Sequence, residues 1–137
     1  GNDIRILPGM LKEQIIKDVD SFLDRLKGED PELKVQAKPR VFVEPMEISS
    51  EEPIVQACIE AYQNVFGYKP KIGGYPAGVD ARFMVNQGKF PAVPAFGPGL
   101  LPISHGPNER VPVIDIIRAT KVYALAALEY LSVNDSG

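Results

Sequence analysis

The chain has 137 residues, 45% of them hydrophobic and 24% charged, so it is long enough for one ordinary domain with a packed core. Its formal net charge of −3 and the absence of a basic run make nucleic acid a poor candidate partner. No apolar run approaches the roughly 20 residues that span a bilayer, and the N-terminus lacks the blocks of a signal peptide. We therefore expect a cytoplasmic protein that binds neither nucleic acid nor a membrane.

The first 45 residues have the pattern of a strand, a helix and a second strand. Residues 3–7 alternate polar and apolar side chains, as a half-buried strand does. Residues 11–26 repeat apolar side chains on one face and predict an amphipathic helix that closes near Gly28. Residues 33–43 alternate again and predict a second strand.

The rest of the chain, residues 46–137, mixes helical and extended patterns. A linker over 44–53 offers Ser49 or Ser50 as the cap of the next helix, with Glu51 and Glu52 in its first turn. Beyond it we expect a helix over 53–66, an extended piece near Lys71, a short helix over 80–86, a strand over 92–96 and a helix over 112–131. This alternation of helices and strands predicts a three-layer α/β fold.

Cys58 is the only cysteine, so an internal disulfide is impossible and a cysteine-based metal site is not expected. It lies on the apolar stripe of the predicted helix over 53–66. This position favours a buried core thiol over a nucleophile, because no histidine and carboxylate pattern surrounds it.

Neither region looks complete by itself. Two strands and one helix supply too little sheet to cover an apolar helix face. The pattern therefore suggests a fragment, or a chain that is completed by a partner.

Four short motifs follow one another along the chain: DIRILPG at 3–9, GGYPAGVDARF at 73–83, PAVPAFGPG at 91–99 and HGPNERVPV at 105–113. Their order and spacing resemble the C-terminal part of the M20 family of metallopeptidases and deacylases. The resemblance implies that residues 1–45 are the second half of an α+β, ferredoxin-like lid and dimerisation domain. It implies that residues 46–137 are the C-terminal part of a three-layer α/β/α zinc-hydrolase catalytic domain.

His105 is the only histidine and lies in a predicted loop. From residue chemistry alone, a single loop histidine is more often an ordinary surface residue. The resemblance implies instead that His105 is the last ligand of a site for two zinc or cobalt ions in the complete enzyme. The other ligands and the general base belong to motifs such as HxD, which this sequence lacks, and Glu51-Glu52 is better explained as a capping feature. One imidazole cannot hold two cations, so we expect this chain alone to be inactive and to bind no metal tightly.

The resemblance also implies that Arg5, Gly78 and Arg82 bind the substrate. Arg5 matches an arginine that grips a substrate carboxylate, but pairing with Asp3 or Glu13 on the surface is the simpler explanation. Gly78 and Arg82 match a turn in which the family has a threonine where this chain has Val79, so the usual substrate preference is in doubt.

Simpler structural roles exist for the other matched residues. Asp80 could cap the short helix and Arg82 could pair with it. Asn108 and Glu109 match the family loop, where they could orient His105 by accepting a hydrogen bond from the ring N–H that does not face the metal. They could equally stabilise the Gly-Pro-Asn turn.

Three functions stay open from the sequence. The first is the C-terminal segment of a metal-dependent amidohydrolase or peptidase, which acts on N-acyl amino acids or small peptides and needs its missing N-terminal half. The second is a non-catalytic remnant that forms a homodimer through the exposed strand edge of the lid half. The third is a small α/β module whose glycine-rich turns hold an anion.

Overall fold

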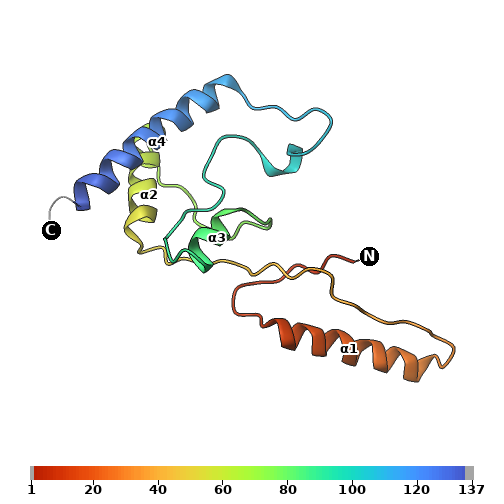
Figure 1. The fold of residues 1–137 in the computed structure, drawn as a ribbon. Coiled ribbons are helices and arrows are strands. Elements are labelled where there is room, and N and C mark those ends of the chain that lie inside the picture. Colours follow the sequence, from red (N-terminus) through yellow and green to blue (C-terminus); the bar gives the residue numbers. More distant parts are fainter. Residues whose placement is uncertain (1, 135–137) are drawn as a thin grey trace. The chain divides into compact units, whose positions relative to one another are not determined.

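The computed structural model describes residues 2–134 and divides the chain into two compact units, Gly1–Glu47 and Ile48–Gly137. Figure 1 shows the course of the chain through each unit. The boundary between the units lies in the segment predicted as a linker. The assignment of residues 1–45 to a lid domain and of 46–137 to a catalytic domain stays a prediction.

Four α-helices and one short 3₁₀ helix form in the described residues. They are α1 (Lys12–Glu29), α2 (Pro53–Phe66), α3 (Ala81–Asn86), the 3₁₀ helix Leu101–Ile103 and α4 (Val113–Asn134). All four predicted helices are therefore confirmed, with ends that differ by at most three residues. None of the described helices is long and apolar enough to cross a membrane.

The predicted fold class is wrong, because residues 2–134 contain no strand. The structure is all-helical, and it is neither a three-layer α/β unit nor half of a ferredoxin-like domain. Strand pairing depends on hydrogen bonds to a neighbouring strand, so an alternating pattern is insufficient without a partner segment. Residues 3–7 and 33–43 carry the alternation and are irregular in the structure.

Backbone geometry also excludes the strand predicted over residues 92–96. Ala95 has φ +53°, in the left-handed region, where a β-strand cannot continue. Pro94 and Ala95 form a turn instead, and the chain bends again at Gly97. This compact apolar segment is part of a loop.

In the first unit, α1 is an amphipathic helix without a buried core. None of its 18 residues is buried, and Ile15, Ile16 and Leu23 are only half-buried. The polar face carries a side-chain hydrogen bond of 2.6 Å from Gln14 to Asp18, at the spacing that places residues on neighbouring turns. The apolar face of α1 therefore retains much of its exposure to solvent.

In the second unit, α2 has a clear start and stop in the sequence. Pro53 is its first residue, where the fixed φ of proline and its missing N–H are tolerated. Gly67 ends it with φ +80°, and its N–H donates to the carbonyl of Gln63 at 2.8 Å. The predicted cap at Ser49 or Ser50 is wrong, because Glu52 holds the cap position and makes no side-chain capping bond.

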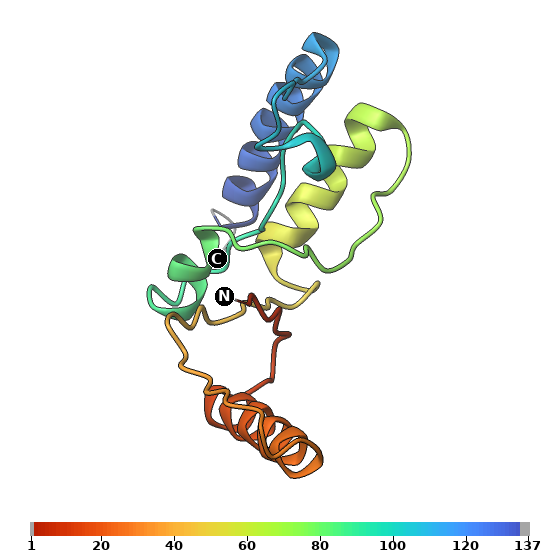
Figure 2. The same ribbon diagram turned by 90° about the vertical axis from the view of Figure 1, so that its right-hand side faces the viewer.

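The core of this unit lies between α2 and α4, which lie side by side in Figures 1 and 2. Ala61 is 1% exposed and Val122 is 3% exposed, and both pack with Cys58 and Ala126. Three of these four side chains are small, so the two helices can approach closely. Among the described elements, α2 and α4 are the one pair in contact.

We expect Ala61→Leu to lower the free energy of unfolding by about 1–3 kcal/mol, because the added methylenes have no space between α2 and α4. Urea unfolding followed by helical circular dichroism measures the change. Gln63→Leu is the matched control, since it adds a leucine at an exposed position of the same helix and should change stability by less than about 0.5 kcal/mol. Equal effects of the two substitutions would contradict this packing.

Candidate functional site

The predicted site residues fall into both units. Arg5 belongs to the first unit, whereas Gly78, Arg82, His105, Asn108 and Glu109 belong to the second. Within the second unit they lie on two connections, residues 67–80 before α3 and residues 97–112 before α4. We call the second connection the His105 loop.

The His105 loop surrounds a cavity of about 420 Å³. Its wall is formed by residues from both arms of the loop, by Tyr75 and by the apolar segment that precedes the loop. The lining residues include Phe96, Leu101, Ser104, Glu109 and Val111. The 3₁₀ helix Leu101–Ile103 shapes the middle of this wall, and Ser104 Oγ donates to the carbonyl of Leu100 at 3.2 Å. The loop therefore has internal hydrogen bonds and borders an open hollow, and His105 is not among the residues that line it.

His105 has an unusual backbone and an exposed side chain. Its φ of +61° lies in the left-handed region, which costs a residue with a Cβ about 1–2 kcal/mol. The N–H of His105 donates to Glu109 Oε2 at 3.0 Å, and the N–H of Glu109 donates to the carbonyl of Gly106 at 3.3 Å. The turn that contains His105 is thus closed by a carboxylate, which accepts a charge-assisted bond.

Glu109 and Asn108 both make hydrogen bonds within the turn. Glu109 holds the backbone of His105, whereas the sequence had suggested that it could orient the imidazole. The carbonyl of Asn108 accepts a weak bond of 3.4 Å from Arg110. For both residues, these contacts lie within the turn, as in the alternative in which they stabilise it.

Arg82 is bound to its own turn. Its Nη1 donates to the carbonyl of Val79 at 3.0 Å and lies 3.8 Å from Asp80 Oδ1, and the guanidinium stacks 4.3 Å from the Phe83 ring centre. The expected pairing of Arg82 with Asp80 is therefore present. Asp80 precedes α3, but it makes no capping hydrogen bond, so the expected cap is wrong.

Gly78 and Arg5 are in simple surroundings. A Cβ at Gly78 would meet only Arg82 Nη1, at an ordinary 3.8 Å. Arg5 forms an ion pair of 3.1 Å with Asp3, and both side chains are 73% exposed. A pair so exposed contributes little to stability, so Arg5 is free of structural demands that would prevent it from binding a carboxylate.

The residues of this chain do not fit a two-metal site by themselves. Among residues 2–134, no group of three or more His, Cys, Asp or Glu side chains comes close enough to hold a metal ion. Glu109 is a carboxylate in contact with His105, and its Oε2 already accepts the backbone bond. Two cations need a bridging carboxylate and several more ligands.

Cys58 is buried as expected, and burial raises the pKa of its thiol. A thiol with a raised pKa carries less thiolate at neutral pH and is a poorer nucleophile. The structure therefore supports the interpretation of Cys58 as a core residue.

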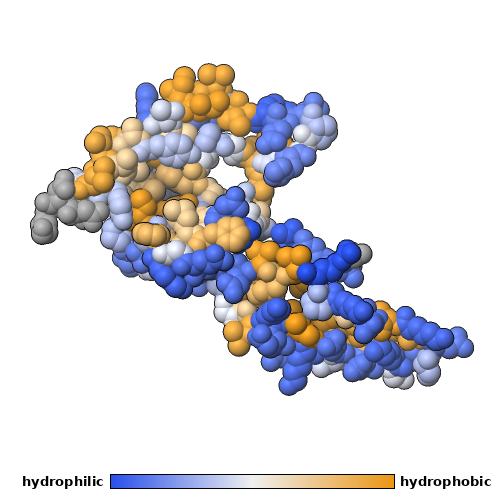
Figure 3. Space-filling view, in the orientation of Figure 1, coloured by the Kyte–Doolittle hydropathy of each residue, from blue (hydrophilic) through white to orange (hydrophobic). Residues whose placement is uncertain are grey.

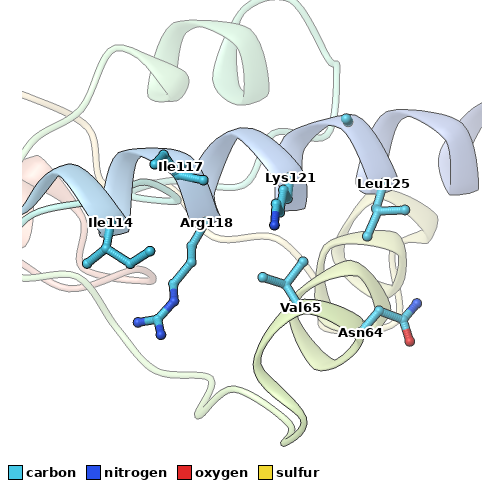
Figure 4. A pocket seen from close by; sticks show the side chains of 8 residues that line it. Asn64, Val65, Ile114, Ile117, Arg118, Lys121 and Leu125 are labelled. Carbon is cyan, nitrogen blue, oxygen red and sulfur yellow. The ribbon is translucent and has the colours of Figure 1, made fainter.

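A second cavity of about 570 Å³ lies between α2 and α4, and sequence reasoning missed it. Figure 4 shows Val65 of α2 directed toward Lys121 and Leu125 of α4. Asn64 of α2 and Ile114 and Arg118 of α4 also line this cavity. Arg118 lies 3.9 Å from Asp115 and 5.6 Å from the ring centre of Phe66. The sequence could have indicated it, because α4 has apolar residues on several sides, more than one partner helix can cover.

We expect His105→Gly to leave the free energy of unfolding unchanged or to raise it by up to about 1 kcal/mol, because glycine adopts a positive φ without strain. His105→Ala is the matched variant, since it removes the imidazole and keeps the strained backbone. Chemical unfolding of the full chain compares the two. If both variants were clearly less stable than the original chain, the imidazole would have a structural role.

Comparison with known proteins defines the family. A sequence model of Peptidase family M20/M25/M40 matches residues 4–129. The chain is 33% identical over 94 residues to a Pyrococcus furiosus protein named "Putative [LysW]-lysine/[LysW]-ornithine hydrolase", a match that covers 69% of this chain and 28% of that protein. It is 27% identical over 78 residues to the Uncharacterized protein YgeY of Escherichia coli K12, which covers 57% of this chain and 19% of YgeY.

The matched region is thus less than a third of each of these relatives. No solved structure matches the chain. The family match, however, extends over nearly the whole sequence and includes both connections that carry the site residues of the second unit. The chain belongs to Peptidase family M20/M25/M40.

Proposed function

We propose that this chain is the C-terminal segment of a metal-dependent amidohydrolase or peptidase, and that it is inactive without the remainder of that enzyme. The observation that carries the proposal is the family match over residues 4–129. M20 enzymes depend on metal ions, and this chain offers one exposed imidazole on an ordered loop. In the complete enzyme His105 would supply one ligand for zinc or cobalt.

A bound metal pair would supply an activated water molecule for hydrolysis. No step of that reaction is assigned to this chain, because its residues do not form the site alone. Their part is to present His105 on a loop closed by Glu109.

The substrate class we propose is an N-acyl amino acid or small peptide. The name of the Pyrococcus furiosus relative describes a hydrolase of lysine or ornithine linked to LysW, which supports an amino-acid substrate. The exposed guanidinium of Arg5 supports a site for a carboxylate. Gly78 and Arg82 are proposed to border the substrate, and Val79 lacks the hydroxyl of threonine, so this contact would be apolar.

The partner we propose is the N-terminal part of such an enzyme. Figure 3 shows apolar side chains gathered over α4 on the visible face of the second unit. The exposed apolar residues of α4 include Val113, Ile114, Ile116, Ile117, Leu128 and Leu131. A soluble monomer rarely leaves so many large apolar side chains of one helix uncovered, so their exposure supports a missing protein partner.

We expect the chain to gain metal-dependent amide hydrolysis when the N-terminal part of a family member is added as a separate chain with Zn²⁺ or Co²⁺. Release of the amino acid from an N-acetyl amino acid measures activity. His105→Ala should lower kcat by about 100-fold or more, since even outer-shell residues of metal sites change activity about 10–100-fold. Gln63→Ala, at an exposed position of α2, is the control and should have no effect.

Two results would contradict this proposal. The first is a folded and metal-loaded complex that hydrolyses no N-acyl amino acid or dipeptide. The second is a His105→Ala complex as active as the original.

The alternative is a non-catalytic remnant that forms a homodimer through the first unit. The strand-edge argument for this dimer is lost, because the described residues of that unit form no strand. A different observation supports the alternative: α1 has no buried residue, and Phe22 on it is 51% exposed. A unit of this size rarely keeps a stable core without added contacts.

If this alternative holds, the chain should sediment at twice its 15.0 kDa mass. Phe22→Glu should raise the dimer dissociation constant about tenfold or more, which corresponds to about 1.4 kcal/mol, because it places a charge in the apolar interface. Ser21→Glu, the neighbouring exposed position, is the control and should leave the dimer intact. A monomer at all concentrations would exclude the homodimer.

A further inference from the structure

The start of the His105 loop is tied to α4 by one side chain. The hydroxyl of Tyr123 donates to the carbonyl of Phe96 at 2.8 Å, across 27 residues of sequence. The rings of Tyr123 and Phe96 also pack with their centres 5.8 Å apart. Phe96 in turn packs against the core formed by α2 and α4.

Gly97 leaves the space that this hydrogen bond needs. A Cβ added at Gly97 would lie 2.9 Å from the Tyr123 hydroxyl oxygen, a distance that real Cβ atoms essentially never show. A larger residue would therefore displace the hydroxyl from the Phe96 carbonyl. The glycine of this turn is explained by the approach of Tyr123.

The other end of the loop is fixed by the same helix. Residue 112 leads directly into α4, whose first residue, Val113, lies ten positions before Tyr123. At a rise of about 1.5 Å per residue, the two attachment points are about 15 Å apart along the helix. The two arms of the loop also meet, because a Cβ at Gly99 would lie 3.3 Å from Val111 Cγ2.

We propose that Tyr123 is a positioning residue for His105: its hydroxyl fixes the first arm of the His105 loop on α4, while Glu109 closes the turn within the loop. The packed rings of Phe96 and Tyr123 hold the start of this arm against the core, and the hydroxyl adds a direct bond to its backbone, so loss of the hydroxyl would give the arm more conformational freedom. Holding a loop in one conformation costs conformational entropy, and a favourable contact at its attachment point offsets part of that cost. The importance of this role for catalysis rests on the proposed function, whereas the attachment itself does not.

Tyr123→Phe in the full chain tests the proposal, because it keeps the ring and removes only the hydroxyl. Amide hydrogen exchange by NMR should become about five- to tenfold faster at Ile103, Ser104 and His105, in line with the loss of one hydrogen bond. The amides of α2 should be unchanged. Gly97→Ala should reproduce the effect from the loop side.

Tyr68→Phe is the matched control. It removes a tyrosine hydroxyl that forms a bond of 3.1 Å with Tyr62 elsewhere in the same unit. We expect it to leave exchange in the His105 loop unchanged. A loop response to Tyr68→Phe equal to that of Tyr123→Phe would overturn the proposal.

The backbone order parameter of His105 reports the local motion of the loop, and a general loss of stability would not change it. In the original chain we expect a value near that of a rigid backbone, about 0.85, and in Tyr123→Phe a value below about 0.6. The single histidine makes its resonances simple to identify.

Two results would overturn the positioning role: an unchanged order parameter, or faster exchange that extends equally over α2. Neither measurement requires hydrolysis. A failed reconstitution with an intact loop response would therefore reject the proposed function alone.

Discussion

The contact between α2 and α4 is the constraint on which the second unit depends. Ala61 and Ala126 bring the two helices together, and Val122 and Cys58 fill the space beside them. The half-buried side chains of Val93 and Phe96 pack against this core, although they belong to an irregular segment. Removing the helix contact would therefore release the segment that leads into the His105 loop as well as the helices themselves.

The same helix pair holds the start of the His105 loop. One side of α4 contributes Val122 and Ala126 to the core, and Tyr123 beside them reaches Phe96 and the Gly97 turn. The His105 loop thus begins and ends on a rigid element, which is how a loop can hold a side chain in a defined position. The left-handed backbone of His105 is consistent with such a role, because strained conformations persist where surrounding contacts determine them.

Both units leave apolar side chains exposed to solvent. The first unit has no buried residue in α1, and α4 exposes isoleucine and leucine side chains that its partner helix does not reach. The matched region is 28% of one relative and 19% of another, so most of the length of each relative lies outside the match. Burial of such surface against further protein is a strong driving force, at about 25 cal/mol per Å².

The sequence by itself determined the positions of the helices, the burial of Cys58 and the family. Helices depend on contacts between residues three and four positions apart, so the apolar periodicity, Pro53 and Gly67 were enough to locate α2. The order of the motifs along the chain identified the family because it does not depend on how the segments pack.

Only the tertiary structure decided the fold class and the contacts of the site residues. A strand forms only when it pairs with a neighbouring strand, which can come from a distant part of the sequence. The alternation in residues 3–7 and 33–43 therefore could not indicate whether such a partner would be present, and the described residues contain none. The positive φ of Ala95 and the bond of Glu109 to the backbone of His105 arise from packing and turn closure. The hydrogen bond from Tyr123 to Phe96, 27 residues away, likewise depends on the fold. A sequence pattern does not tell which distant segments come into contact when the chain packs.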